Sequence, residues 1–201
     1  ATTSVAGADI NVADAWKLTA GNPEVIVAIV DEGVKYTHPD LAANMWINPN
    51  PSPEYKNQDI HGWNFAADGP ISWGQKGDSG HGTHVAGTVA AVNNNGIGVC
   101  GVAGGTGKGD GVRLMSCQIF SGDLTGDALV SSRAVKYAAD HGASILQCSW
   151  GIKAGIYTSD NMFIKQSPTD YEALQYFAAQ KNCEALDGGL IVFSAGNEST
   201  A

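Results

Sequence analysis

The sequence predicts an α/β fold, in which a doubly wound and mostly parallel sheet carries helices on both faces. Three observations carry this prediction. Four apolar runs are continuously hydrophobic rather than alternating, as in strands that are buried on both sides. Segments with the apolar spacing of helices lie between these runs. The 26 glycines among 201 residues suit a fold with many tight turns and close contacts between helices and strands.

The predicted strands are the four apolar runs. They span Val25–Val30, Arg113–Phe120, Ala143–Trp150 and Gly189–Ser194. Right-handed crossovers between parallel strands place their carboxyl ends at one edge of the sheet, where such folds bind ligands.

Three helices are predicted between the strands. The first spans His81–Val92, where valines recur on one side and small residues permit close approach. The second spans Asp127–Gly142, from a capping aspartate to a glycine stop signal. The third spans Ser167–Lys181, with a proline at its first helical position. The long segment Trp46–Gly80 is rich in Pro, Gly, Asn and Trp, and we expect a loop that is functional or ordered by packing.

Composition narrows the classes of function. The net charge of -9, with only 11 Lys plus Arg, argues against a nucleic-acid-binding protein. No apolar stretch approaches the roughly 18 residues that span a bilayer. The start Ala1-Thr2-Thr3-Ser4 is interpreted as that of a mature or processed product.

The cysteines are widely separated and lack the CxxC spacing of zinc sites. They are Cys100, Cys117, Cys148 and Cys183. Cys117 and Cys148 lie in strand-like runs and are expected to be buried free thiols, while one disulfide stays open as an alternative.

Asp31 and His81 are the residues that point to chemistry. Asp31 ends an apolar strand, and His81 opens a helix of small residues. Each has an ordinary structural interpretation, as a turn aspartate and as a helix-capping histidine. Together they match two members of the machinery that activates a serine nucleophile. A zinc site on His81 and His84 is disfavoured, because the histidines are three apart without the glutamate of a zinc protease helix.

Four motifs in order resemble the subtilisin-like serine proteases. The segment Val30-Asp31-Glu32-Gly33-Val34, followed by Thr37-His38-Pro39-Asp40-Leu41, resembles the aspartate region of that family. The run His81-Gly82-Thr83-His84-Val85-Ala86-Gly87-Thr88 resembles its histidine signature. Cys148-Ser149-Trp150-Gly151 resembles the substrate-binding strand, and Ser194-Ala195-Gly196-Asn197-Glu198 resembles the oxyanion segment. The resemblance implies that residues 1–201 are the N-terminal portion of a single subtilisin-like catalytic domain, incomplete without a C-terminal segment.

The resemblance assigns catalytic roles to Asp31, His81 and Asn197. His81 takes the proton of the attacking serine, and Asp31 holds the imidazole in the correct tautomer. Asn197 donates its side-chain amide to the oxyanion. The resemblance also implies a secreted protein, extracellular or periplasmic.

The substrate is expected to lie extended between two backbone edges by strand addition. These edges are Ser121-Gly122 and Ser149-Trp150-Gly151. Trp150 departs from the smaller aliphatic residue common in the family, and either reshapes the primary pocket or only packs against the loop. Glu32 departs from the common Ser or Thr and resembles the acidic residue of kexin-like members, which by itself does not imply basic-residue specificity.

A calcium loop is also implied by the resemblance of residues 93–99. Its oxygen ligands are Asp40, Val92, Asn94, Ile97 and Val99, with Asn94 or Asn95 open as the side-chain donor. A polar turn without metal is the alternative.

The family's serine motif, Gly-Thr-Ser at the start of a late helix, is not in this sequence. Ser79 resembles the nucleophile of trypsin-like proteases, but it directly precedes the proposed base on the same loop and is rejected. The expected explanation is a nicked enzyme, in which a second chain or C-terminal fragment carries the serine. A truncated chain and a peptide-binding pseudoprotease are the alternatives.

Overall fold

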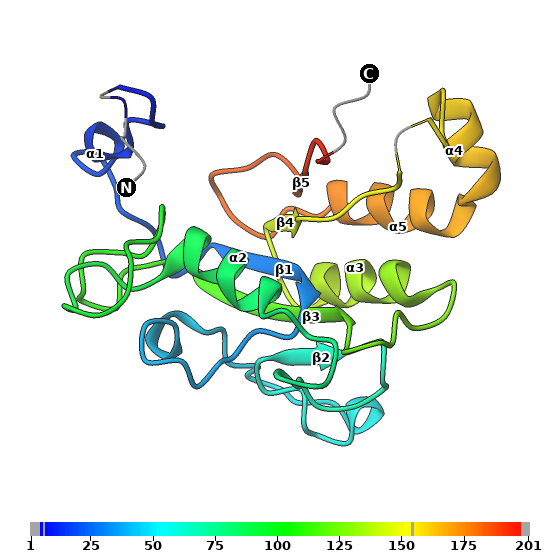
Figure 1. Cartoon of the computed structure of the whole chain (residues 1–201), viewed down its shortest axis with the longest axis horizontal. Coiled ribbons are helices and arrows are strands. Elements are labelled where there is room, and N and C mark those ends of the chain that lie inside the picture. The colour runs from blue at the N-terminus through cyan, green and yellow to red at the C-terminus, as the bar shows by residue number, and fades with distance from the viewer. Residues whose placement is uncertain (1–4, 6, 154, 198–201) are drawn as a thin grey trace.

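The structure is a computed structural model that describes residues 5, 7–153 and 155–197. Its described part contains a sheet of five strands in the order β2-β3-β1-β4-β5, with every recorded pair parallel (Figure 1). The strands are β1 (Ile26–Glu32), β2 (Gly62–Asn64), β3 (Arg113–Phe120), β4 (Ile145–Cys148) and β5 (Leu190–Phe193). The helices are α1 (Val12–Ala15), α2 (His81–Ala90), α3 (Val130–Asp140), α4 (Asp160–Gln166) and α5 (Pro168–Ala178), with 3-10 turns at Ala42–Asn44 and Pro53–Tyr55.

The predicted strands are confirmed, with changes at their ends. β3 has the predicted bounds, and β4 and β5 are shorter than the apolar runs that contain them. β1 continues through Asp31 to Glu32, because polar residues at the end of a strand do not interrupt its pairing with β3. β2 lies inside the segment predicted as a loop, since three residues are too few to form an apolar run.

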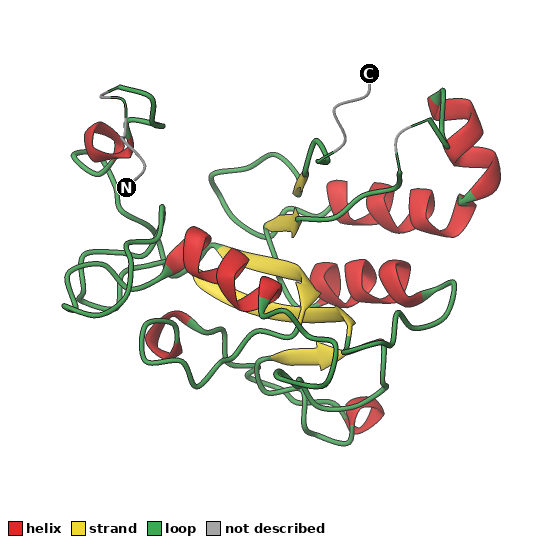
Figure 2. Ribbon diagram, in the orientation of Figure 1, coloured by secondary structure: helices red, strands yellow, loops and turns green. Residues whose placement is uncertain are grey.

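Side chains of β1 alternate between the two faces of the sheet, and each face is covered by helices (Figure 2). Val27 and Ile29 belong to the cluster that contains Ala86 and Ala90 of α2. Ala28 and Val30 belong to the cluster that α3 and α5 cover on the opposite face. The doubly wound fold is therefore confirmed, and this alternation places residue 31 on the face of α2.

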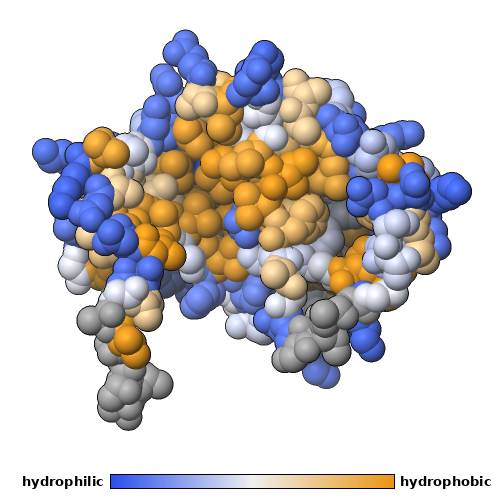
Figure 3. Space-filling model, turned by 90° about the horizontal axis from the view of Figure 1, so that it is seen from above, coloured by the Kyte–Doolittle hydropathy of each residue, from blue (hydrophilic) through white to orange (hydrophobic). Residues whose placement is uncertain are grey.

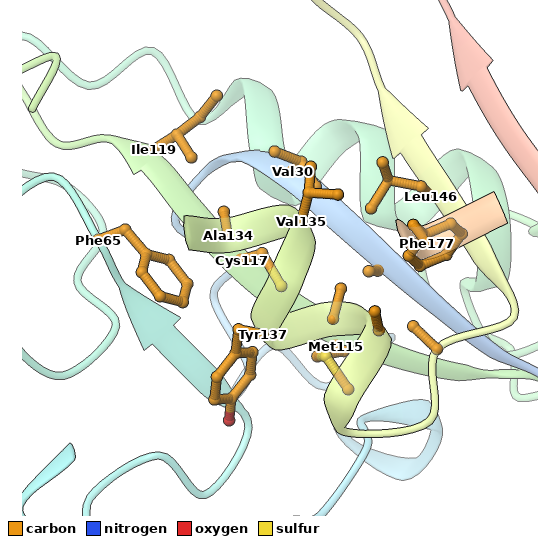
Figure 4. Packing of buried hydrophobic residues seen from close by; sticks show 14 of the residues in the cluster. Val30, Phe65, Met115, Cys117, Ile119, Ala134, Val135, Tyr137, Leu146 and Phe177 are labelled. Carbon is orange, nitrogen blue, oxygen red and sulfur yellow. The ribbon is translucent and has the colours of Figure 1, made fainter. Parts of the chain in front are cut away.

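The larger cluster is filled by both aliphatic and aromatic side chains. Figure 4 shows Val135 and Tyr137 of α3 lying over residues of the central strands, with Phe177 of α5 beside Leu146 of β4. Cys117 and Cys148 lie in this core as free thiols, as predicted.

The helix boundaries follow local capping. Gly80, with φ of 79°, precedes α2, and Pro168 occupies the first turn of α5 as predicted. α3 begins at Val130 rather than at the predicted Asp127, whose carboxylate instead accepts the N–H of Leu129 in a preceding turn. Gly142 follows α3 with φ of 86°, a conformation that favours glycine and ends the helix.

The long segment 46–80 is ordered around a buried carboxylate. Asp59 is fully buried and accepts hydrogen bonds from the Asn48 amide, the Ser52 N–H and the Tyr137 hydroxyl. The Tyr137 bond attaches the segment to α3, so packing around Asp59 orders a segment whose regular structure is limited to β2 and the 3-10 turn at Pro53–Tyr55.

β5 is an edge of the sheet, and its apolar side chains are exposed. Leu190, Val192 and Phe193 are 48%, 39% and 44% exposed. Figure 3 views the side on which β4, β5 and α5 lie in Figure 1 and shows hydrophobic residues gathered across it. An apolar surface at an unpaired sheet edge is a site that proteins normally cover.

Candidate active site

Asp31 and His81 meet at the edge of the sheet where the parallel strands end. Asp31 lies near the end of β1 on the side of α2, and His81 is the first residue of that helix. The Nδ1 atom of His81 lies 2.7 Å from Oδ1 of Asp31. The Asp31 side chain is 2% exposed, whereas that of His81 is 49% exposed. The pair therefore has a buried carboxylate that orients a ring exposed at the surface.

Burial dominates the electrostatics of Asp31. It raises the pKa of this carboxyl above its ordinary value, against hydrogen bonds from His81 and from the N–H of Glu32, which lower it. The other oxygen, Oδ2, is buried without a hydrogen-bond partner in the described part of the chain. Burial and the nearby Asp31 charge also raise the pKa of the Cys148 thiol to about 12, so this thiol stays protonated at neutral pH.

The first turn of α2 is held by Glu32. The Glu32 carboxylate accepts the N–H of His81 at 2.9 Å, the N–H of Ser79 at 3.2 Å and the Ser79 hydroxyl at 2.9 Å. Burial alone raises the pKa of Glu32, but the bonds from Ser79, His81 and Gly80 outweigh it and lower the pKa below its ordinary value. Glu32 is therefore an ionised anchor at the positive end of the helix.

Glycines make the approach of α2 to β1 possible. A Cβ atom on Gly82 of α2 would overlap the carbonyl oxygen of Glu32 in β1. Gly33 is constrained separately, since its Cβ would overlap the carbonyl oxygen of Ser72 in the loop before α2. The glycine after the histidine is thus required by the contact that brings His81 to Asp31.

The Ser149-Trp150-Gly151 segment follows β4 at the same edge. Trp150 donates its indole N–H to the Val30 carbonyl at 2.8 Å and packs edge-on against Phe120 and Phe193. A cavity of about 340 Å³ borders it, lined by residues that include Gly151, Ile152, Phe163, Leu174 and Ser194. Trp150 thus both packs against the core and forms a wall of this cavity.

The other predicted edge, Ser121-Gly122, follows β3. The backbone of Ser121 exchanges two hydrogen bonds with Leu124, and the Gly122 N–H is donated to Asp78 at 2.6 Å. These backbone groups are therefore used within the protein, and the pairing of Ser121 and Gly122 with a substrate stays a prediction.

Asn197 follows β5, after Gly196 with φ of 86°. The segment lies beside the predicted substrate strand, since the Ser194 N–H is donated to the Cys148 carbonyl at 3.0 Å. Asn197 is exposed at the end of this segment, and Glu198, the last residue of the motif, lies outside the described residues. Its role as oxyanion donor stays a prediction.

The predicted calcium ligands are only partly gathered. The buried Asp40 carboxylate accepts the Asn95 amide N–H at 2.7 Å and the Val99 N–H at 2.9 Å, whereas the Asn94 amide is donated to the Thr106 carbonyl. The N–H groups of Val92 and Ile97 bond to the Asp40 carbonyl and the Asn95 side chain, which brings both residues next to Asp40 and Asn95. The part of Val92 and Ile97 in the prediction is that of their carbonyl oxygens. In this arrangement the Asp40 oxygens accept N–H donors, and the binding of Ca²⁺, which takes oxygen ligands, stays a prediction.

Two carboxylates at the site were not predicted to act there. Glu32 anchors His81, and Asp78 holds Gly122; both partners lie more than 40 residues away in sequence. The sequence offers one local sign of these contacts. Asp78 and Ser79, both of residue types that cap helices, stand just before the helix that begins at His81. Ser79 is occupied by Glu32, consistent with its rejection as a nucleophile.

Comparison with known proteins places these motifs in one family. The model of the subtilase family (peptidase S8) matches residues 22–201. Halolysin of Haloferax mediterranei is 33% identical over 142 residues, which cover 71% of this chain and 24% of halolysin. Furin of Bos taurus is 31% identical over 189 residues, which cover 94% of this chain and 21% of furin. The chain thus spans less than a quarter of these relatives.

A solved structure agrees in fold. The Aeromonas sobria serine protease, in complex with its chaperone, superposes with a TM-score of 0.62 at 22% identity, over 90% of this chain and 26% of that one. The family match over residues 22–201 and the buried Asp31 beside His81 lead to one conclusion. This chain belongs to the subtilase family.

Proposed function

We propose that this chain forms part of the active site of a serine endopeptidase, supplying the aspartate, the histidine and the oxyanion asparagine. The observation that carries the proposal is the 2.7 Å hydrogen bond between a buried Asp31 and a half-exposed His81. Membership of the subtilase family supports the same activity.

In this proposal His81 is the general base and then the general acid. Since Nδ1 faces Asp31, the other ring nitrogen, Nε2, takes the proton of the serine hydroxyl as its oxygen attacks the peptide carbonyl. The imidazolium is stabilised by Asp31 and gives that proton to the leaving amine. Water then hydrolyses the acyl-enzyme by the same proton route. Asn197 donates an N–H to the oxyanion.

The serine comes from a second polypeptide or a C-terminal fragment. The exposed Leu190, Val192 and Phe193 on the edge strand support this part of the proposal, because a further segment of sheet or helix would cover them. The substrate is a protein or peptide that lies extended along Ser149–Gly151, with a side chain in the cavity beside Trp150.

Secretion and calcium are separate parts of the proposal. Residues 5, 7–153 and 155–197 include no helix long and apolar enough to cross a membrane. Secretion is proposed from the family alone, and fractionation of the source cells tests it.

Calcium binding near Asp40 requires the present hydrogen bonds of its carboxylate to open. Thermal unfolding in CaCl₂ or in EDTA tests this binding, and equal midpoints of unfolding would exclude the site.

The central experiment combines intact mass spectrometry with labelling by a fluorophosphonate. We expect the native preparation to contain this chain together with a serine-bearing polypeptide that takes the label. A single unlabelled 20.8 kDa species would contradict the proposal. Absence of labelling with retained peptide binding would instead identify the alternative, a non-catalytic peptide-binding pseudoprotease.

A further inference from the structure

Glu32 occupies an unusual position next to the aspartate that orients His81. Successive side chains of a regular strand point to opposite faces of the sheet. Asp31 and Glu32 nevertheless both reach α2, one through the His81 ring and the other through the His81 backbone. The pairing of β1 with β3 shifts register between these two residues, so that Asp31 lies opposite Gln118 and Glu32 opposite Phe120. Such an irregularity re-aims a side chain.

The helix needs this carboxylate. Gly80 is the N-cap of α2 and has no side chain with which to cap the first N–H groups. Glu32 supplies the missing acceptor from the neighbouring strand, and one of the groups that it binds is the N–H of His81 itself. The positive end of the helix and the two bonds from Ser79 favour the ionised form of Glu32.

Two adjacent residues of β1 therefore bind the side chain and the backbone of the same histidine. Asp31 determines where the ring nitrogen lies, and Glu32 determines where the backbone that carries the ring begins. Loss of either contact leaves the ring with one point of attachment to β1. A displacement of the ring by about 1 Å is enough to lower the rate of a reaction that uses it as general base.

We propose that Glu32 is a positioning residue for His81, acting through the first turn of α2 rather than through the substrate. The inference rests on the proposed function only in the role that it gives to His81. The competing interpretation is that Glu32 faces the substrate and binds a basic side chain. Its carboxylate already accepts hydrogen bonds from Ser79 and His81, which favours positioning.

The test follows the His81 Nδ1 proton by NMR in the full protein, including the serine-bearing segment. A proton shared between Nδ1 and Asp31 gives a far-downfield signal whose exchange with solvent reports how firmly the ring is held. We expect Glu32→Ala to speed this exchange at least tenfold. Glu32→Gln keeps an oxygen acceptor for the His81 N–H and should restore slow exchange. Glu24→Ala, the same change at an exposed position before β1, is the control.

A second variant keeps the test decisive if Glu32→Ala does not fold. Glu32→Asp keeps the charge but shortens the side chain by one methylene, so we expect fast exchange there as well. Exchange at the wild-type rate in a folded Glu32→Ala or Glu32→Asp would overturn the proposal.

Steady-state kinetics separate positioning from substrate contact. We expect Glu32→Ala to lower kcat about tenfold with KM unchanged, and a raised KM with kcat unchanged would assign Glu32 to substrate binding. If the wild type has no proteolytic activity, the proposed function fails, and the proton signal still decides whether Glu32 holds His81.

Discussion

Trp150 donates its indole N–H to the carbonyl of Val30, 2.8 Å away and 120 residues earlier in the chain. Val30 directly precedes Asp31, so this bond joins the predicted substrate strand to the strand that carries the carboxylate facing His81. The recorded pairing of β1 with β4 ends at Ile29, and the indole provides a donor to β1 one residue later. The departure from a smaller aliphatic residue at position 150 thus has a structural consequence in addition to any effect on the substrate pocket.

Trp150→Phe removes this donor and leaves a ring that still contacts Phe120 and Phe193. We expect a loss of about 1–3 kcal/mol in the free energy of unfolding, because the Val30 carbonyl loses its partner in a partly buried place. Urea denaturation followed by far-UV circular dichroism measures it. Trp16→Phe is the matched control, since that indole also donates to a carbonyl, of Val102, but in an exposed place. Equal losses in the two variants would contradict the prediction.

Two glycines of α2 should respond in opposite directions to alanine. Gly82→Ala drives a Cβ into the Glu32 carbonyl and is expected to destabilise the protein by more than about 2 kcal/mol. Gly87 has open space where its Cβ would be, so Gly87→Ala is expected to stabilise by about 0.5–1 kcal/mol through helix propensity. Thermal and urea unfolding of both variants provide the comparison. A stabilised Gly82→Ala would show that α2 does not approach β1 as described.

The sequence predicts those features of the fold and the site that depend on residues close together in the chain. It does not predict features that depend on pairing between distant segments. β3 has the bounds that the sequence predicts, because five of its eight residues are apolar and flank only single polar ones. The Asp31–His81 pair was predicted because each residue marks the end of an element. β2 was missed, since Gly62–Asn64 becomes a strand only by pairing with β3. The anchoring of His81 by Glu32 was missed for the same kind of reason, because it depends on a shift of register between β1 and β3.

The pH dependence of stability should reveal the anchor at Glu32. Its folded pKa lies below the ordinary value of 4.5, so its contribution is present above that pH and is lost as the pH falls through the folded pKa. We expect wild type to exceed Glu32→Gln by about 1 kcal/mol in unfolding free energy near pH 6, and the difference to shrink below pH 4.5. Urea midpoints between pH 3 and 7 test this. If the difference in unfolding free energy between wild type and Glu32→Gln grew on acidification, the prediction would be contradicted.

Asp40 should matter for stability whether or not calcium binds. Asp40→Asn replaces one buried carboxylate oxygen by an amide nitrogen that faces an N–H of Asn95 or Val99. We expect a loss of about 2 kcal/mol in unfolding free energy, measured in EDTA to remove any metal. Asp110→Asn is the control, because that carboxylate also accepts two bonds, from Thr106, but in an exposed place. A loss no larger than in the control would mean that the Asp40 contacts do not hold the loop.

Asn197 gives the sharpest test of catalytic function, because its predicted partner exists only during the reaction. The side chain is exposed after β5, and an oxyanion donor should contribute little to substrate binding and much to the transition state. In subtilisin, removing this donor costs about 100- to 1000-fold in kcat, and we expect a similar loss for Asn197→Ala in the serine-complemented enzyme, with KM nearly unchanged. Asn161→Ala, at an exposed position on α4, should keep full turnover. A variant at position 197 that raises KM while keeping kcat would place Asn197 in substrate binding, and the oxyanion would then need another donor.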